Sequence, residues 1–326
     1  MLNGAGMLIF SEETQTVNSF AVDVRNGLGQ TGQKELLSKY LYDDVGCALF
    51  EAITRLPEYG LTRAEERILR EHSDDIAEHL MAHGMVVELG SGSGRKTRQI
   101  LEALAHYKSM TYCPIEISSE ALVRCERELD DLAHVSILGF ETEYLDGLGK
   151  AVARREPGDS VVVLFLGSSI GNFDRGPADE FLRKIRYAIK PGDMLLLGTD
   201  LEKPLTQLIL AYDDALGVTG AFNRNLLARI NRELGGDFEL SQFQHVALYN
   251  ARERRVEMHL RSMETQIITI DGTRFTLQCD ETIWTESCHK YRRNEPSEMA
   301  WRTGFECVAQ WVDGEWPFAE NLFVAV

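Results

Sequence analysis

The segment VVELGSGSGRKT, from Val86 to Thr97, decides the fold that the sequence predicts. An apolar run leads straight into three alternating glycines, at positions 90, 92 and 94, and then into a stretch with helical apolar spacing. Glycine allows a sharp backbone turn and a close approach to a ligand, and a helix N-terminus attracts anions. The segment is therefore predicted to be a strand, a ligand-binding loop and a helix in succession.

The segments around this loop continue the alternation of strand and helix, which is typical of βαβ units and a parallel sheet. Apolar runs bounded by turn residues predict strands at Met85–Leu89, Met110–Ile117, Val135–Gly139, Ser160–Leu166 and Met194–Gly198. Amphipathic spacing predicts helices at Lys96–Leu104 and Ser119–Leu132. Together these elements predict an α/β domain of the doubly wound, Rossmann-like type.

The pattern changes after residue 203. Residues 204–248 have a helical pattern, and strands are predicted at Arg255–Arg261, Thr265–Ile270 and Arg274–Gln278. The C-terminal tail predicts an antiparallel hairpin at a sheet edge. A length of 326 residues suits two packed units, since domains average roughly 150 residues. We predict a parallel-sheet domain at 64–202 plus 283–326 and a second lobe at 10–63 plus 203–282.

The composition argues against several classes of function. Lys and Arg number 34 and Asp and Glu 51, so the formal net charge of −17 repels the phosphates of nucleic acids. No apolar run is long enough to span a bilayer, and the N-terminal stretch lacks the features of a secretion signal. The six cysteines form no CxxC pair, which favours thiols over disulfides or a metal site. We therefore expect a cytoplasmic protein that acts on small molecules, with no nucleic-acid or membrane partner.

Three nucleotide-containing cofactors compete for the glycine loop. A dinucleotide loop needs G-x-G-x-x-G and a Walker A loop needs glycine directly before lysine, but Arg95 occupies the deciding position in both cases. Glu88, at the end of the strand, opposes a polyphosphate and suits the sulfonium and ammonium groups of S-adenosylmethionine. An E-x-G-x-G-x-G loop is common in enzymes that use this cofactor. The alternative is a purely structural turn.

A second acidic residue favours a bound adenosine. Glu116 ends the second predicted strand 26 residues after Gly90, close to the spacing at which an acidic residue accepts hydrogen bonds from ribose hydroxyls. The alternative for Glu116 is a solvated loop charge. Phe140 and Glu141 follow the third strand, where an adenine is usually flanked. The predicted cofactor site thus comprises Glu88, Gly90, Ser91, Gly92, Glu116, Phe140 and Glu141.

Longer stretches of the chain are similar to a known family. They are YDDVGCALFEAITRLPEYGLTRAE (42–65), VELGSGSGRKT, FLGSSIGNF (165–173), GTDLEK, AYDDALGVTGAFNRNLL (211–227), VEMHLRS (256–262) and TESCHKY (285–291). Together they resemble the histidine Nα-methyltransferase family of ergothioneine biosynthesis. The similarity extends over nearly the whole chain, from about residue 36 to the tail.

The resemblance implies a Rossmann-like class I S-adenosylmethionine methyltransferase domain with a second, substrate-binding lobe. It also implies three successive methyl transfers to the α-amine of L-histidine, giving the trimethylated betaine hercynine. Carried over motif by motif, it adds Lys96 and Gly167 to the cofactor site. The residues that it places around the substrate are Tyr59, Gly167, Ser169, Asn172, Tyr212, Met258, Glu286 and Cys288.

The chemistry of four of these residues is consistent with such roles. Asn172 follows the fourth predicted strand, where open α/β sheets bind ligands, and its amide can donate to a carboxylate, as can the hydroxyl of Tyr212. The alternatives are a helix cap at Asn172 and a packing role for Tyr212. Glu286 can accept an imidazole N–H, or else is a solvent-facing charge. Met258 alternates with polar neighbours and is expected inside the lobe, either in the core or beside the substrate.

Methyl transfer is an in-line displacement in which the cofactor supplies the reactive carbon and the protein supplies alignment. The amine attacks only when it is neutral. We expect Tyr59 and Gly167 to orient its lone pair and Asn172 to clamp the substrate, with no metal and no dedicated strong base.

Two alternatives remain open at this point. The acceptor can be another amino acid, such as tryptophan or an indole derivative, and the chain can be a non-catalytic cofactor-binding relative. Cys288 stands where the family more often carries serine, and a thiol is the weaker hydrogen-bond partner. We expect a monomer or a weak dimer.

Overall fold

The computed structural model describes residues 8–11 and 16–326, and their contacts divide the chain into two units. Unit 1 comprises residues 8–11, 61–202 and 291–326, and unit 2 comprises residues 16–60 and 203–290. Each unit is therefore assembled from segments that lie far apart in the sequence. No helix within the described ranges is long and apolar enough to cross a membrane.

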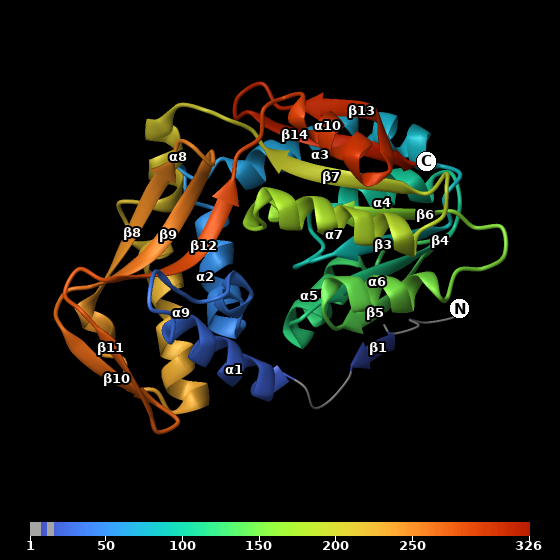
Figure 1. Ribbon diagram of the computed structural model, residues 1–326. Helices are drawn as coiled ribbons and strands as arrows, with labels where there is room; N and C mark the ends of the chain where they lie inside the picture. The colour runs from blue at the N-terminus through green and yellow to red at the C-terminus, as the bar shows by residue number, and fades with distance from the viewer. Residues whose placement is uncertain (1–7, 12–15) are drawn as a thin grey trace. The chain divides into compact units, whose positions relative to one another are not determined.

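Unit 1 is built on a sheet whose described strands follow the order β1-β5-β4-β3-β6-β7-β14-β13 (Figure 1). The strands from β1 to β7 in that order are parallel, whereas β14 is antiparallel to both of its neighbours. This arrangement confirms the predicted Rossmann-like α/β fold. The strand bounds are β1 Leu8–Ser11, β3 Met85–Leu89, β4 Met110–Glu116, β5 Val135–Glu141, β6 Val161–Phe165, β7 Met194–Asp200, β13 Phe305–Val312 and β14 Phe318–Ala325.

Helices cover both faces of this sheet because its central strands are apolar on both sides. Met85, Val87 and Leu89 of β3 belong to one core cluster with side chains of α6, α7 and α10. Alternation along the strand turns Val86 and Glu88 to the opposite face, which carries α3, α4 and α5. The helices are α3 Leu61–Leu80, α4 Thr97–Ala105, α5 Ser119–Leu129, α6 Tyr144–Val152, α7 Arg175–Ala188 and α10 Glu295–Thr303, with a 3-10 turn η2 at Ser169–Asn172.

The strand order reverses between β3 and β6, because β4 and β5 lie on one side of β3 and β7 lies on the other side of β6. In open α/β sheets, ligands bind beyond the carboxyl ends of the strands at such a reversal. The loops after β3 and β6 therefore occupy the position at which this fold builds a ligand site.

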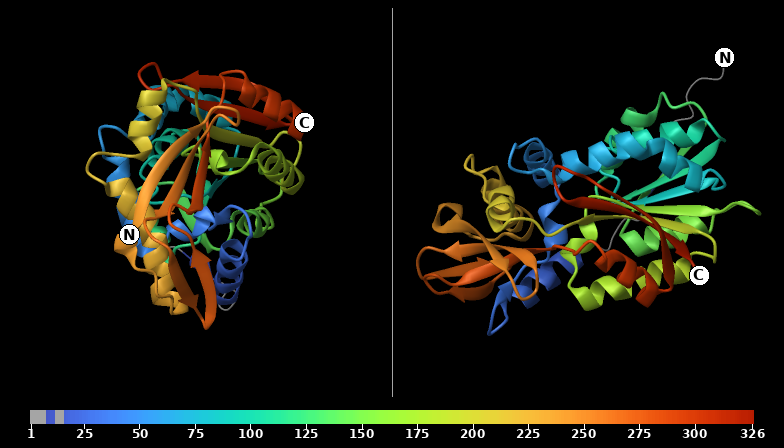
Figure 2. Two further views of the ribbon diagram at one scale, coloured as in Figure 1. Left: turned by 60° about the vertical axis from the view of Figure 1, so that its left-hand side comes forward. Right: turned by 90° about the horizontal axis from the view of Figure 1, so that it is seen from above.

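Unit 2 contains a four-stranded sheet in the order β2-β12-β9-β8 and a β10-β11 hairpin, counted over its described residues. Figures 1 and 2 show the long helix α9 alongside the four-stranded sheet. The strands are β2 Lys34–Glu35, β8 Phe243–Asn250, β9 Arg255–Ser262, β10 Gln266–Ile270, β11 Thr273–Leu277 and β12 Thr282–His289. The helices are α1 Thr16–Leu28, α2 Asp44–Thr54, α8 Leu205–Tyr212 and α9 Val218–Leu234, with 3-10 turns η1 Ser38–Leu41 and η3 Leu240–Gln242.

The predicted helical pattern over residues 204–248 is wrong at its C-terminal end. Helix α9 ends at Gly235, whose left-handed backbone (φ 62°) and following glycine terminate it, and β8 begins at Phe243. Phe243 and His245 are buried whereas Gln244 between them is exposed, which is the period of a strand.

The observed division of the chain also differs from the predicted one. Residues 283–290, predicted to belong to the sheet domain, lie in or directly after β12, which pairs with β9 in unit 2. At the other end, residues 10 and 11, predicted for the second lobe, belong to β1, which pairs with β5 in unit 1. Residues 12–15 of the predicted lobe lie outside the described residues.

We predict that Gly94→Ala destabilises the protein. Gly94 has φ +74°, and a Cβ there would lie 2.8 Å from Cys125 Sγ and 3.2 Å from Leu129 Cδ1. The left-handed backbone and the overlap together should lower the free energy of unfolding by about 2 kcal/mol or more. The measurement is the midpoint of thermal unfolding by circular dichroism.

Gly149→Ala in helix α6 is the matched control, because no atom lies within 4 Å of its added Cβ. Alanine favours a helix interior by up to about 1 kcal/mol over glycine, so its midpoint should stay level or rise. Equal midpoints for the two variants would contradict the predicted strain in the loop.

Candidate active site

The loop after β3 has the backbone that its glycines predict. Gly90, Gly92 and Gly94 all have positive φ, at 76°, 55° and 74°. A Cβ at Gly92 would meet no atom within 4 Å, whereas a Cβ at Gly90 would lie 3.1 Å from Tyr144 Oη. The loop is thus closely packed at Gly90 and open at Gly92, which leaves room for a ligand beside the backbone of residue 92.

Glu116 lies at the end of β4, directly against this opening. Its Oε1 accepts a hydrogen bond of 2.7 Å from the N–H of Gly92, and its Oε2 accepts one of 3.2 Å from Ile117. Burial raises the pKa of Glu116, and these two N–H groups partly offset that effect. Each carboxylate oxygen keeps a further lone pair, so Glu116 can accept the two hydroxyls of a ribose. The residues present therefore fit an adenosine.

The two residues predicted to flank an adenine have different surroundings. Phe140 is fully buried in the core and stacks on Phe10 with ring centroids 5.5 Å apart. Glu141 is half-buried at the end of β5, and its Cα is the register partner of Glu116 on the neighbouring strand. Glu141 thus lies beside the ribose-binding candidate, whereas Phe140 supports the sheet beneath it.

Glu88 is enclosed below the loop. Only 2% of it is exposed, and both of its oxygens accept from Thr97 Oγ1 at 2.7 Å, while the hydroxyl of Tyr112 donates to Oε2. Burial raises the pKa of Glu88 to about 7, although the hydrogen bonds from Tyr112 and Thr97 favour its ionised form. Glu88 therefore ties the start of α4 to β3 and β4.

The loop after β6 is joined to the glycine loop by a residue that the sequence did not single out. Glu65 of α3 accepts a hydrogen bond from the N–H of Gly167 and forms an ion pair with Lys96. Burial is the largest single effect and lowers the pKa of Lys96, but the charge and hydrogen bond of Glu65 and the charges of Glu88 and Glu320 together outweigh it, so the net shift is upward. The structure thus brings Lys96 and Gly167, both predicted cofactor residues, to one buried carboxylate.

Ser169 and Asn172 begin and end the 3-10 turn that follows this loop. Gly167 and Ser168 both have positive φ, at 73° and 58°, and the hydroxyl of Ser168 accepts from the N–H of Asp200 at 2.8 Å. The N-cap of α7 is Asp174, so Asn172 does not cap that helix. Asn172 is half-buried at the strand-order reversal, where the predicted role requires it to be.

In unit 2, Tyr212 belongs to a buried polar cluster. Its hydroxyl donates to Cys288 Sγ at 2.8 Å and accepts from Lys290 Nζ at 2.8 Å, and Lys290 also donates to Cys288 Sγ at 3.1 Å. Lys290 is fully buried. His245 Nε2 lies 2.8 Å from the carbonyl of Tyr212, and burial lowers the pKa of this imidazole, so it is neutral and donates there. Tyr212 is thus held at both its backbone and its hydroxyl.

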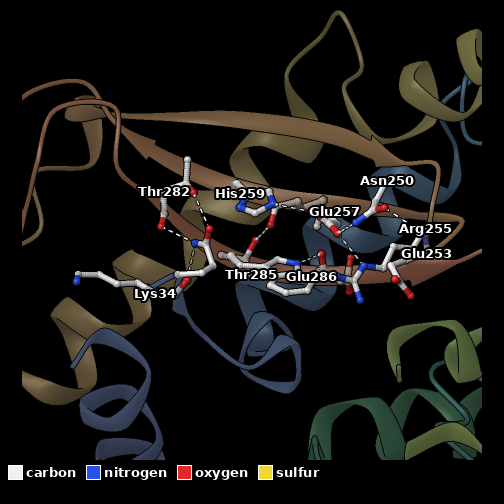
Figure 3. Close-up of polar contacts among 12 residues, drawn as sticks. Lys34, Asn250, Glu253, Arg255, Glu257, His259, Thr282, Thr285 and Glu286 are labelled. Carbon is white, nitrogen blue, oxygen red and sulfur yellow. Dashed lines mark hydrogen bonds and ion pairs between the residues drawn. The ribbon is translucent and has the colours of Figure 1, made fainter. Parts of the chain in front are cut away.

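Glu286, like the other predicted substrate residues of unit 2, is buried, with 9% exposed, which excludes a solvent-facing charge. Burial raises its pKa to about 7, while the charge of Lys290 and a hydrogen bond with Tyr42 favour ionisation. Its register partner on β9 is Met258, which is 2% exposed, and the neighbouring Thr285 donates to the Met258 carbonyl at 3.0 Å. Figure 3 shows Glu286 and Thr285 on β12 next to the polar residues of β9.

Aromatic rings surround this part of unit 2. Tyr59 is buried and contacts Tyr212 and Phe50 edge-on, with centroids 6.2 and 6.3 Å apart. Tyr42 contacts Phe50 and Phe222, each at 5.5 Å. Among the predicted substrate residues, Tyr59, Tyr212, Met258, Glu286 and Cys288 thus belong to one unit, and Gly167, Ser169 and Asn172 to the other.

Three further polar residues of these clusters, Glu65, Tyr42 and Lys290, were not predicted from the sequence. For Glu65 the signal was a charge on the apolar stripe of a helix, four residues after Leu61 and three before Ile68. For Lys290 it was the alternation of positions 286, 288 and 290, which share one side of an extended chain if TESCHKY is a strand. Tyr42 carried no such signal.

Comparison with known proteins identifies the family. The family model described as "Histidine-specific methyltransferase, SAM-dependent" matches residues 20–325. A histidine N-alpha-methyltransferase of Mycobacterium tuberculosis is 39% identical over 92% of this chain and 93% of its own length, and one of Mycolicibacterium smegmatis is 40% identical over 93% and 94%. Ergothioneine biosynthesis protein 1 of Neurospora crassa is 30% identical over 96% of this chain and 37% of its own length. The chain therefore belongs to the family of histidine-specific, S-adenosylmethionine-dependent methyltransferases.

Proposed function

We propose that this chain transfers three methyl groups to the α-amine of L-histidine, giving Nα,Nα,Nα-trimethylhistidine (hercynine) for ergothioneine biosynthesis. The names of its relatives support the acceptor and the pathway. The observation that carries the proposal is Glu286, a buried carboxyl group in unit 2 that lies among Tyr42, Lys290 and Met258. A carboxylate has acceptor capacity beyond its hydrogen bond with Tyr42, and an imidazole N–H is a donor that can use it.

The cofactor is S-adenosylmethionine, which supplies a methyl group already activated on a sulfonium. In our proposal, Glu116 accepts the ribose hydroxyls, and the open backbone at Gly92 admits the adenosine. Lys96 and Gly167, held by Glu65, bind the amino-acid end of the cofactor. Glu88 acts indirectly, by fixing the start of α4 to β3.

The amine has to be neutral and aligned before it attacks, so the protein must orient it without stabilising an ammonium. We assign this orientation to the hydroxyl of Tyr59 and the backbone at Gly167. For the substrate carboxylate we assign Asn172 and Tyr212 as donors. Lys290 donates to the Tyr212 hydroxyl, which polarises that O–H and strengthens it as a donor.

The acceptor ring distinguishes histidine from the alternative, tryptophan. An imidazole can carry a positive charge, whereas an indole cannot, so a carboxyl group that ionises near neutral pH favours histidine. Met258 limits the space opposite Glu286 on the neighbouring strand. Cytoplasmic location, a monomeric or weakly dimeric state and the absence of a nucleic-acid partner stay predictions.

A substrate panel tests the acceptor directly. The full-length protein is incubated with isotope-labelled S-adenosylmethionine and each of the twenty amino acids, and the products are identified by mass spectrometry. We expect mono-, di- and trimethylated histidine in sequence, with label on the α-nitrogen. Methylation of tryptophan at a higher rate than histidine would replace the proposed acceptor, and label on the imidazole ring would overturn the site of transfer.

Glu286→Gln tests recognition of the ring and its pH dependence. Ionised Glu286 accepts the imidazole N–H, and protonation at low pH removes that charge, so histidine binding should strengthen as the pH rises through about 7. We expect Glu286→Gln to weaken binding about 10-fold at about pH 8 and to flatten this rise, because a hydrogen bond to a charged acceptor is lost.

Binding is measured by calorimetry with S-adenosylhomocysteine present, which avoids the titration of the amine during turnover. Glu264→Gln, at an exposed position in the same unit, is the matched control and should bind histidine as the wild type does. An identical pH profile in Glu286→Gln would remove Glu286 from the site.

Glu116→Gln tests the cofactor site. The amide has a single acceptor oxygen and no charge, so it cannot hold both Gly92 N–H and the ribose diol as the carboxylate does. We expect S-adenosylmethionine affinity to fall about 10-fold, measured by calorimetry without an acceptor. The exposed Glu120→Gln, in the first turn of α5, serves as control. Equal affinities for the two variants would contradict the ribose assignment.

A further inference from the structure

Unit 1 buries more carboxyl groups behind the glycine loop than its cations can neutralise. Glu65 and Glu320 are 0% exposed and Glu88 is 2% exposed, and the ammonium that acts on all three is that of Lys96. If every group were ionised, the cluster would carry two uncompensated negative charges. Such burial costs several kcal/mol per unpaired ion, so the cluster must hold at least one proton.

Glu65 is the member with the most donors. Its Oε1 accepts from the N–H of Gly167, and its Oε2 accepts from Lys96 Nζ. Both oxygens of Glu65 therefore already accept from strong donors, so this side chain is placed to accept a further hydrogen bond and not to donate one.

Glu320 has the opposite environment. Among the described residues, no hydrogen-bond donor reaches either of its oxygens. It lies on β14 with Gly198 of β7 as its register partner, and an ideal Cβ at Gly198 would be 3.0 Å from Glu65 Oε1 and 3.2 Å from Glu320 Oε1. The two carboxyl groups thus face each other across a glycine. Burial, then the charge of Glu65, raises the pKa of Glu320 well above its ordinary value, and Lys96 opposes this only in part.

We propose that Glu320 is a positioning residue for methyl transfer: as a neutral acid it donates its proton to Glu65 and so holds Glu65 against Gly167 and Lys96. A buried carboxyl group without donors is satisfied only by donating, and the neighbouring carboxylate is the acceptor in reach. The inference rests on the proposed function in one respect, namely that Gly167 and Lys96 contact the cofactor.

The position of the Leu166–Gly167 peptide follows from this arrangement. Its N–H is fixed by Glu65, and its carbonyl accepts from the hydroxyl of Ser169 at 3.1 Å. The backbone at Gly167 has φ +73°, which is an uncommon conformation. The two hydrogen bonds hold this peptide at its N–H and at its carbonyl. Loss of the proton from Glu320 would put two negative charges side by side and remove the hydrogen bond that holds Glu65 in position.

Infrared spectroscopy tests the protonation state in the wild-type protein. At about pH 8.5, ordinary carboxyl groups are ionised, so a C=O band of a neutral carboxylic acid identifies a strongly perturbed group. We expect such a band, shifted by ¹³C-glutamate labelling, in the wild type and in the exposed control Glu306→Gln. The band should disappear in Glu320→Gln. Its absence from the wild type, or its persistence in Glu320→Gln, overturns the proposal.

Cofactor affinity tests the positioning role. Glu320→Ala removes the donor to Glu65, and we expect S-adenosylmethionine to bind about 10-fold more weakly. Glu320→Gln keeps an uncharged donor of the same length, and we expect it to restore affinity to within about 3-fold of the wild type. Glu306→Ala and Glu306→Gln, on the neighbouring strand β13, are the matched pair of controls.

Two outcomes overturn the positioning role: unchanged affinity in Glu320→Ala, or a loss in Glu320→Gln as large as in Glu320→Ala. If Glu320→Ala does not fold, the infrared band and the Gln variant still decide. No acceptor is present in these measurements, so an error in the proposed acceptor leaves the test intact, and the substrate panel detects that error separately.

Discussion

The geometry of unit 1 depends on two backbone turns with positive φ at the reversal of strand order, one after β3 and one after β6. Both turns start where an apolar strand ends, and both need glycine, because a left-handed backbone costs other residues about 1 kcal/mol or more. The two turns are coupled through a single side chain, since Glu65 binds the N–H of Gly167 and the ammonium of Lys96. Helix α3, which directly precedes β3 in the chain, therefore links the glycine loop to the distant loop after β6.

Unit 2 depends on a different interaction, a cluster of buried polar groups that bond to one another. Tyr212, Cys288 and Lys290 satisfy one another, and Glu286 is balanced by Lys290 and Tyr42. A buried network of this kind is rigid while its members remain paired. In the proposed function, the substrate carboxylate and ring would replace these internal partners one for one, so that binding exchanges hydrogen bonds and leaves no polar group unsatisfied.

The sequence predicted the parallel sheet well because its signals are local. The five predicted strands of the sheet agree with β3, β4, β5, β6 and β7 to within two residues at their ends, and the C-terminal hairpin is confirmed. The sequence did not predict the strand β12, which depends on pairing between distant segments. Five residues of TESCHKY are polar or charged, so the segment gives no apolar strand pattern, yet its first five residues belong to β12, which pairs with β9, and most of the segment is buried. Tertiary pairing, which a single sequence does not reveal, decides such a segment.

The residues of the candidate site also fall into two groups, those that local sequence signals reveal and those that only the fold reveals. Gly90 and Glu116 could be found from spacing alone, since a glycine loop and an acidic residue at a strand end are a recognisable pair. Glu65 and Glu320 could not, because a charge on the apolar stripe of a helix does not reveal its partners, and Glu320 looks like a surface charge on a strand. Their significance comes from meeting at Gly198, a contact between α3, β7 and β14 that only the folded chain creates.

Cys288 has a consequence for changing the specificity of this protein. Sulfur is larger and more polarisable than oxygen and a weaker hydrogen-bond acceptor. The thiol therefore fills more volume and makes dispersion contacts, whereas a hydroxyl would make a directional hydrogen bond. Its neighbours Tyr212 and Lys290 contact the sulfur atom itself, and the backbone of β12 is held by its ladder to β9. If the substrate site is as proposed, a single-atom exchange at this position changes the chemistry next to the acceptor while β12 keeps its pairing with β9, which makes residue 288 a starting point for engineering new acceptors.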